Sequence, residues 1–214
     1  TLNYAAHHLA VDQRIHYTNR SPEALPDLVL MVEPRSYSGV FQLDALEWGP
    51  GRPVEGWNWD GAQVHIPLPE SLTPGGSLEF SIAYQLQLPS PQPSAETRPV
   101  PFGYTARQAN LVDWYPFVPP FLPGEGWLAH RPGYFGEHLA YDLADFEVTL
   151  KLENAPDGST VAASAPAETG EPEGVYRYRH PAARNFALSI SDQYETLTET
   201  VGGVTVTGYH FPFH

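Results

Sequence analysis

Nine histidines and 25 carboxylates are the residues of this 214-residue sequence that could bind a metal ion. Zinc peptidases place two histidines four residues apart on a helix with a glutamate between them, so that both rings reach one ion and the glutamate activates its water. No such pentapeptide occurs in the sequence. His130, Glu137 and His138 lie on one glycine-rich loop that could fold back on itself. A self-contained hydrolase using these three side chains is therefore one alternative, but the sequence predicts no metal site.

Nucleophilic catalysis has no recognisable motif here either. A Gly-x-Ser-x-Gly elbow is absent, and so is any lysine-bearing phosphate loop. The absence of cysteine removes thiolate nucleophiles, thiolate zinc ligands and disulfides together. The sequence therefore predicts no catalytic residue and no cofactor in this chain.

Tryptophans suggest a second alternative, because flat amphipathic rings suit both sugar faces and protein surfaces. A carbohydrate- or protein-binding module would use Trp57, Trp59, Trp114 and Trp127. Asn19-Arg20-Ser21 is formally a glycosylation sequon, although Pro22 follows it.

Charge and hydropathy limit the partners of the chain. The formal net charge of −14 repels nucleic acid and anionic membrane surfaces. No apolar run approaches the roughly 20 residues that a bilayer span needs. The acidic, cysteine-free composition is compatible with an exported or membrane-anchored bacterial protein, but it selects no compartment.

The sequence consists mainly of short segments in which apolar and polar residues alternate, and these segments would position any functional site. Proline and glycine make up about a fifth of the chain, which disfavours long helices. Residues 77–88 alternate strictly and predict a strand with one apolar face. Further strands are predicted at residues 14–18, 28–32, 41–48, 63–68, 144–152, 159–163, 175–179, 185–191 and 204–211. This spacing is typical of an all-β, antiparallel sandwich.

Two proline-rich segments interrupt the strands. Residues 89–101 are predicted to form an exposed connection, and residues 102–136 are predicted to form a long aromatic and proline-rich loop region. No internal repeat divides the chain, so we expect a single domain over residues 1–214.

Three segments, taken in order, carry a resemblance to a known family. They are Tyr17-Thr18-Asn19 with residues 25–30, Trp114-Tyr115-Pro116 with Gly126-Trp127 and residues 141–150, and Val161-Ala162-Ala163 with residues 183–191. Together they resemble the N-terminal domain of the M1 zinc metallopeptidases, the aminopeptidase N family. The likeness extends over nearly the whole chain.

The resemblance implies a saddle-like β-sandwich without catalytic residues of its own. In that family a separate, mainly helical domain follows and carries the Gly-Ala-Met-Glu-Asn loop and the zinc-binding His-Glu-x-x-His motif. The sequence printed here stops at His214, about where such a domain would start. The expected partners are thus a downstream catalytic domain of the same polypeptide, which would hold zinc, and a peptide substrate.

The resemblance also suggests functional residues. Family N-terminal domains lend a glutamine to the substrate cleft about eleven residues before the proline that Pro116 matches. Thr105 stands at that spacing, and Gln108 follows three residues later as the substrate-pocket candidate. The cysteine-x-aspartate that usually follows the proline is replaced by Phe117-Val118-Pro119. The candidates for the interdomain surface are Trp114, Tyr115, Phe117 and Trp127.

Overall fold

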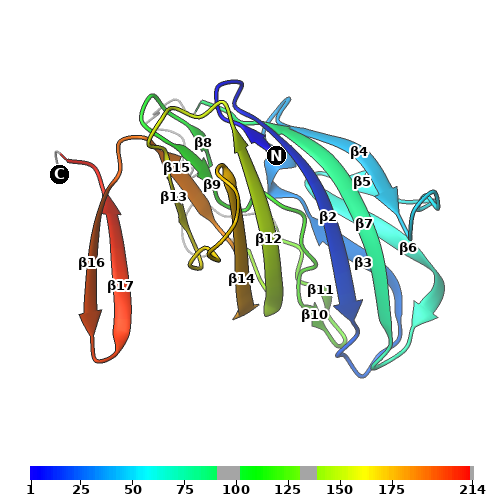
Figure 1. The fold of residues 1–214 in the computed structure, drawn as a ribbon. Helices are drawn as coiled ribbons and strands as arrows, with labels where there is room; N and C mark the ends of the chain where they lie inside the picture. Colours follow the sequence, from blue (N-terminus) through cyan, green and yellow to red (C-terminus); the bar gives the residue numbers. More distant parts are fainter. Residues whose placement is uncertain (91–101, 131–138, 213–214) are drawn as a thin grey trace.

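A six-stranded sheet forms one layer of the protein. The computed structural model describes residues 1–90, 102–130 and 139–212. In spatial order the sheet contains β14 (Val175–Ala183), β12 (Ala144–Glu153), β1 (Leu2–Asn3), β2 (His8–Thr18), β7 (Ser77–Gln87) and β4 (Phe41–Glu47). Figure 1 shows its strands running side by side across the front of the molecule. All neighbouring strands are antiparallel except β1 and β12, which are parallel.

Two smaller sheets supply the second layer. One contains β3 (Leu25–Met31), β6 (Gln63–Leu72) and β5 (Asn58–Asp60), and the other contains β13 (Thr160–Ala163), β15 (Leu188–Ser191), β9 (Ala109–Leu111) and β8 (Gly103–Tyr104). A short hairpin joins β10 (Phe121–Leu122) to β11 (Gly126–Trp127). A 3₁₀ turn at Glu33–Ser36 is the only helical element among the described residues, and no helix there could span a membrane. The prediction of an all-β, antiparallel sandwich is confirmed.

The core is one apolar cluster between these layers. Alternation along β7 buries Phe80, Ile82, Tyr84 and Leu86 on one side, as the sequence pattern predicts. Side chains from β3, β6, β9 and β15 meet them from the opposite layer. Burial of both inner faces therefore holds the layers together through the hydrophobic effect.

The hairpin of β16 (Glu195–Val201) and β17 (Val204–His210) projects from this body, as Figure 1 shows. Every residue of both strands is exposed. One face carries threonines and Tyr209, and the other carries Glu195, Glu199 and His210 together with four apolar side chains that are 57–67% exposed: Leu197, Val201, Val204 and Val206. Two strands alone make a marginal structure in water, so this apolar face is suited to being covered by a partner.

Buried tyrosines should make the fold sensitive to alkali. Burial raises the pKa of Tyr84 well above its usual range, and burial also raises the pKa of Tyr115. Above pH ~10 the unfolded chain loses these protons while the folded chain retains them, so stability falls as pH rises. We expect the melting temperature to drop progressively beyond pH ~10 in a thermal scan. Tyr84→Phe should flatten that drop, whereas Tyr209→Phe, at a more exposed position, should follow the parent chain.

Candidate functional site

Gln108 stands on the polar face of the four-stranded sheet. The backbone N–H groups of Arg107 and Gln108 donate to Thr105 Oγ1 at 3.2 and 3.3 Å, and this turn leads directly into β9. Ala109 and Leu111 are buried on the inner side of β9. Because successive side chains alternate, Gln108 and Asn110 point to the opposite, polar side.

Hydrogen bonds fix the orientation of the Gln108 amide. The Tyr194 hydroxyl donates to Gln108 Oε1 at 2.8 Å. Tyr194 in turn lies 2.6 Å from Ser189 Oγ, which also hydrogen-bonds to the Asn110 side chain. Ser189 and Asn110 are directly opposite each other across β15 and β9. This network holds the carbonyl end of the Gln108 amide toward Tyr194 and its NH₂ end away from it.

The Gln108 amide keeps hydrogen-bonding capacity for a ligand. Within residues 1–90, 102–130 and 139–212, no acceptor is bonded to its Nε2. Two N–H donors and a second lone pair on Oε1 therefore remain. Such a group can bind a carbonyl oxygen or an ammonium group, but it supplies no nucleophile and no general base.

The root of the β16–β17 hairpin borders this site. The Tyr194 ring lies 6.1 Å from the Tyr209 ring and 5.1 Å from the Phe211 ring, measured between centroids. The Arg107 guanidinium covers Phe211 at 3.9 Å. Gln108 therefore lies close to the root of the exposed hairpin.

Trp114 and Tyr115, two of the four interdomain candidates, are buried in the core of this chain. Trp114 Nε1 donates to the Phe186 carbonyl at 3.1 Å, and the Phe186 N–H donates to the Tyr115 hydroxyl at 3.0 Å. Both rings thus hold the backbone just before β15. In this structure they stabilise the sheet and present little surface to a partner.

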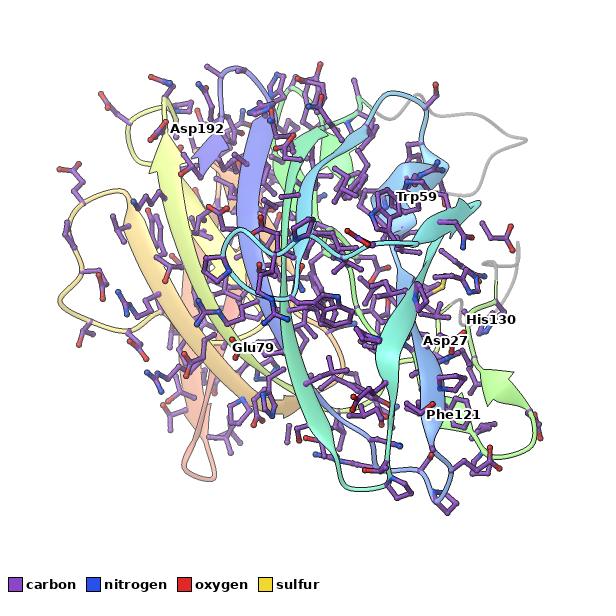
Figure 2. The ribbon with its side chains drawn as sticks, turned by 90° about the vertical axis from the view of Figure 1, so that its right-hand side faces the viewer. Asp27, Trp59, Glu79, Phe121, His130 and Asp192 are labelled. Atoms are coloured by element: carbon purple, nitrogen blue, oxygen red, sulfur yellow. The ribbon has the colours of Figure 1, made fainter. Side chains whose placement is uncertain are left out.

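Phe117 and Trp127, the other two candidates, are half-buried. Phe117 exchanges backbone hydrogen bonds with Met31, and its ring lies 4.6 Å from that of Tyr141. Trp127 Nε1 donates to Asp27 at 3.1 Å. Figure 2 shows Asp27 beside Phe121 at one end of the molecule. The exposed parts of these two rings remain predicted contact surface for a second domain.

The residues of the two alternatives from the sequence are only partly brought together among the residues that the structure describes. His130 is exposed, while Glu137 and His138 lie outside the described residues, so that hydrolase site stays a prediction. Elsewhere in the described chain no three histidine or carboxylate side chains gather to hold a metal. The four tryptophans do not share one surface: Trp57 and Trp59 pack edge to face at 5.8 Å, whereas Trp114 is buried in the core.

Comparison with known proteins identifies the fold. No protein-family model and no curated protein sequence matches the chain. An M1 zinc metallopeptidase from Deinococcus radiodurans has a similar structure, with 20% identity and a TM-score of 0.56 over 94% of this chain and 42% of that one. A two-domain M1 zinc metallopeptidase mutant bound to L-tryptophan is similar over 94% of this chain and 43% of its own, with 20% identity and a TM-score of 0.55. The chain has the fold of part of these enzymes and spans less than half of their length.

Proposed function

We propose that residues 1–214 form the non-catalytic N-terminal domain of an M1-type zinc aminopeptidase, packing on a catalytic domain of the same polypeptide and shaping its substrate cleft. One observation carries this proposal: the fold matches almost all of this chain but well under half of each M1 structure. The remaining length in those enzymes leaves room for a domain that holds the zinc. The described residues bring no metal-ligand group together, so we assign no step of zinc chemistry to this chain.

Gln108 has the hydrogen-bonding groups to recognise the amino end of a peptide. Its Oε1 already accepts from Tyr194 and has a lone pair left for an ammonium hydrogen. Its Nε2 hydrogens suit the carbonyl oxygen of the first residue. The neighbouring network reduces the side-chain entropy lost on binding, because the amide is already oriented. We therefore assign Gln108 a substrate-binding role at the rim of the cleft.

Two apolar surfaces support packing on a second domain. The exposed parts of Phe117 and Trp127 form the first, and the apolar face of the β16–β17 hairpin forms the second. Contiguous exposed apolar side chains in a soluble domain commonly mark a contact surface. The root of the hairpin lies close to Gln108. A second domain that packs on the hairpin would therefore lie near the substrate-binding amide.

Domain complementation tests the proposal. The full polypeptide, loaded with zinc, should release the fluorophore from an aminoacyl coumarin amide, and residues 1–214 alone should not. Mixing residues 1–214 with the separately produced remainder should restore turnover. Translation that ends at His214, or hydrolysis by residues 1–214 alone, would contradict the proposal.

A Gln108→Ala variant of the full polypeptide should raise KM by about ten- to a hundredfold, because the loss of hydrogen bonds to a charged amino group costs about 1.5–3 kcal/mol. Gln108→Glu should retain binding of the ammonium group, since the carboxylate still accepts hydrogen bonds from it. Arg14→Ala, on the exposed face of β2, serves as the control and should leave kcat and KM unchanged. An unaltered KM for Gln108→Ala would remove Gln108 from the substrate site.

A further inference from the structure

An open cleft of about 660 Å³ lies where edge strand β4 of the large sheet meets edge strand β5 of the three-stranded sheet. Its volume is in the range of small-molecule sites. Its lining combines three aromatic rings with one cationic and two anionic side chains: Phe41, Trp57, Trp59, Arg35, Asp44 and Glu47. Figure 2 shows Trp59 on the same side of the molecule as Asp27 and Phe121, above both of them in this view. Phe117 and Trp127 do not line the cleft.

Aromatic rings form one wall of this cleft. Trp57 and Trp59 alternate onto the same side of the chain, with their ring centroids 5.8 Å apart in an edge-to-face arrangement. The Phe41 ring stands edge-on to Trp59 at 5.9 Å. All three are only half-buried, so part of each ring remains open to a ligand. Because these rings are nearly perpendicular to one another, a flat ligand can stack on one of them at a time, and the fixed rings lose little side-chain entropy on binding.

Arg35 places a fixed cation beside that wall. Its guanidinium lies 4.2 Å from the Trp59 ring centroid, and its Nη1 donates to the Gly61 carbonyl at 2.7 Å. A guanidinium has five N–H donors, so several remain for a ligand.

The two carboxylates supply acceptors on the β4 side. Asp44 sits at a bulge in β4, and amide hydrogens from Gln42 and Gln85 hold its two oxygens at 3.0 and 2.8 Å. Glu47 is half-buried, and its carboxylate makes no hydrogen bond or ion pair with any residue the structure describes. The cleft is thus lined by Asp44, whose carboxylate is held by two side-chain amides, by Glu47, whose carboxylate is unpaired among the described residues, and by Arg35.

This mixture of charges selects the class of ligand. An anionic ligand would be repelled by Asp44, Glu47 and the overall charge of −14. A cationic ligand would compete with Arg35, whose guanidinium already occupies a face of the Trp59 ring. A neutral ring with one apolar face and several hydroxyls fits all the groups, because hydroxyls both donate and accept hydrogen bonds. We propose that this cleft binds a neutral pyranose sugar unit, with its C–H face on Trp57 and its hydroxyls directed to Arg35 and Glu47.

Titration of the whole 214-residue chain tests this site without reference to any peptidase activity. Tryptophan fluorescence is followed while glucose, galactose, mannose, N-acetylglucosamine and their short oligomers are added, with arginine and glutamate as charged comparators. We expect a saturable change with at least one neutral sugar and none with the charged compounds. Comparing monomers with oligomers shows whether the ligand is a free sugar or a unit of a longer glycan.

Variants then connect binding to the cleft. Trp57→Ala should weaken binding about tenfold, or about 1.4 kcal/mol, because it removes the ring on which the sugar stacks. Trp57→Phe keeps part of the ring surface, and Glu47→Gln removes a charge that has no partner in the described chain; both should weaken binding several-fold. The control Trp127→Phe should bind as the parent does, and melting curves verify that each variant is folded.

Three results would overturn the site. They are no saturable response to any sugar at tens of millimolar, preferential binding of arginine or glutamate, and unchanged affinity in folded Trp57→Ala and Trp57→Phe. A failure here would leave the aminopeptidase-domain proposal intact, since that proposal does not use the cleft. Likewise, failed domain complementation would leave sugar binding to be judged by the titration.

Discussion

Replacing Trp114 with alanine should lower the free energy of unfolding by about 3–5 kcal/mol, the usual cost of truncating a buried aromatic residue. The indole is 8% exposed, packs edge to face against Tyr115 at 5.4 Å and donates to the Phe186 carbonyl. Its loss opens a cavity and leaves that carbonyl without its indole donor. Domains of this kind are stable by about 5–15 kcal/mol, so the variant should unfold at a much lower denaturant concentration. Guanidinium unfolding followed by far-ultraviolet circular dichroism measures the difference.

Two milder variants separate packing from hydrogen bonding at this site. Trp114→Phe keeps an aromatic ring but removes the N–H donor, so it should cost less than the alanine variant. Tyr115→Phe leaves the buried Phe186 N–H without its acceptor and should cost about 1–3 kcal/mol. A loss under about 1 kcal/mol for Trp114→Ala would mean that the aromatic segment is not part of the core.

The second large effect is expected at Asn19, which is fully buried. Its Nδ2 donates to the carbonyls of Glu23 and Leu72, each at 2.8 Å, and its Oδ1 accepts from the Ser21 N–H at 2.9 Å. The side chain thus ties the β2–β3 turn to the end of β6. Asn19→Ala removes three hydrogen bonds to buried or half-buried groups, so we expect a loss of about 2–5 kcal/mol in unfolding free energy.

Asn19→Asp tests whether the two N–H donors of the Asn19 amide are what stabilises the fold at this position. The introduced carboxylate has nearly the same shape, but the oxygen that replaces Nδ2 faces two carbonyl oxygens, so the variant should be at least as destabilised as Asn19→Ala at neutral pH. The exposed Asn58→Ala is the matched control and should change stability by under about 0.5 kcal/mol. A small effect in both Asn19 variants would show that water replaces these hydrogen bonds. Because both amide hydrogens are engaged inside the protein, the formal sequon at Asn19 is inaccessible in the folded chain.

Strands with a strong alternating pattern could be predicted from the sequence. The prediction for residues 77–88 differs from β7 by only one residue, because burial of one face imposes a period of two. The strand at residues 204–211 was also predicted, but its partner β16 was not. Residues 195–201 consist largely of threonine and glutamate, and no described residue of the chain buries them, so they carry no burial pattern. The short strands β8 to β11 were likewise missed, since two or three residues cannot show a period.

Functional residues were harder to predict because their neighbours come from distant parts of the chain. Gln108 was selected by family resemblance, yet its orientation depends on Tyr194, 86 residues further on. Trp114 and Tyr115 were predicted at a surface because aromatic and proline-rich sequence looks alike in a loop and in a core; their contacts with Phe186 bury them. The cleft that brings Trp57 to Phe41 and Arg35 requires the edges of two sheets to meet, and no local pattern encodes that.

The parallel pairing of β1 with β12 also affects how the protein is made. Leu2 lies opposite Leu152, so β1 is synthesised about 150 residues before this neighbouring strand exists. At typical elongation rates of about 5–20 residues per second, this interval lasts on the order of 10 seconds. Strands β2, β7 and β4 can pair earlier, and β1 can meanwhile dock only against β2. The large sheet is thus completed late in biosynthesis. In a nascent chain halted before β12, the backbone N–H and C=O groups on one side of β1 would be unpaired and could bind a chaperone.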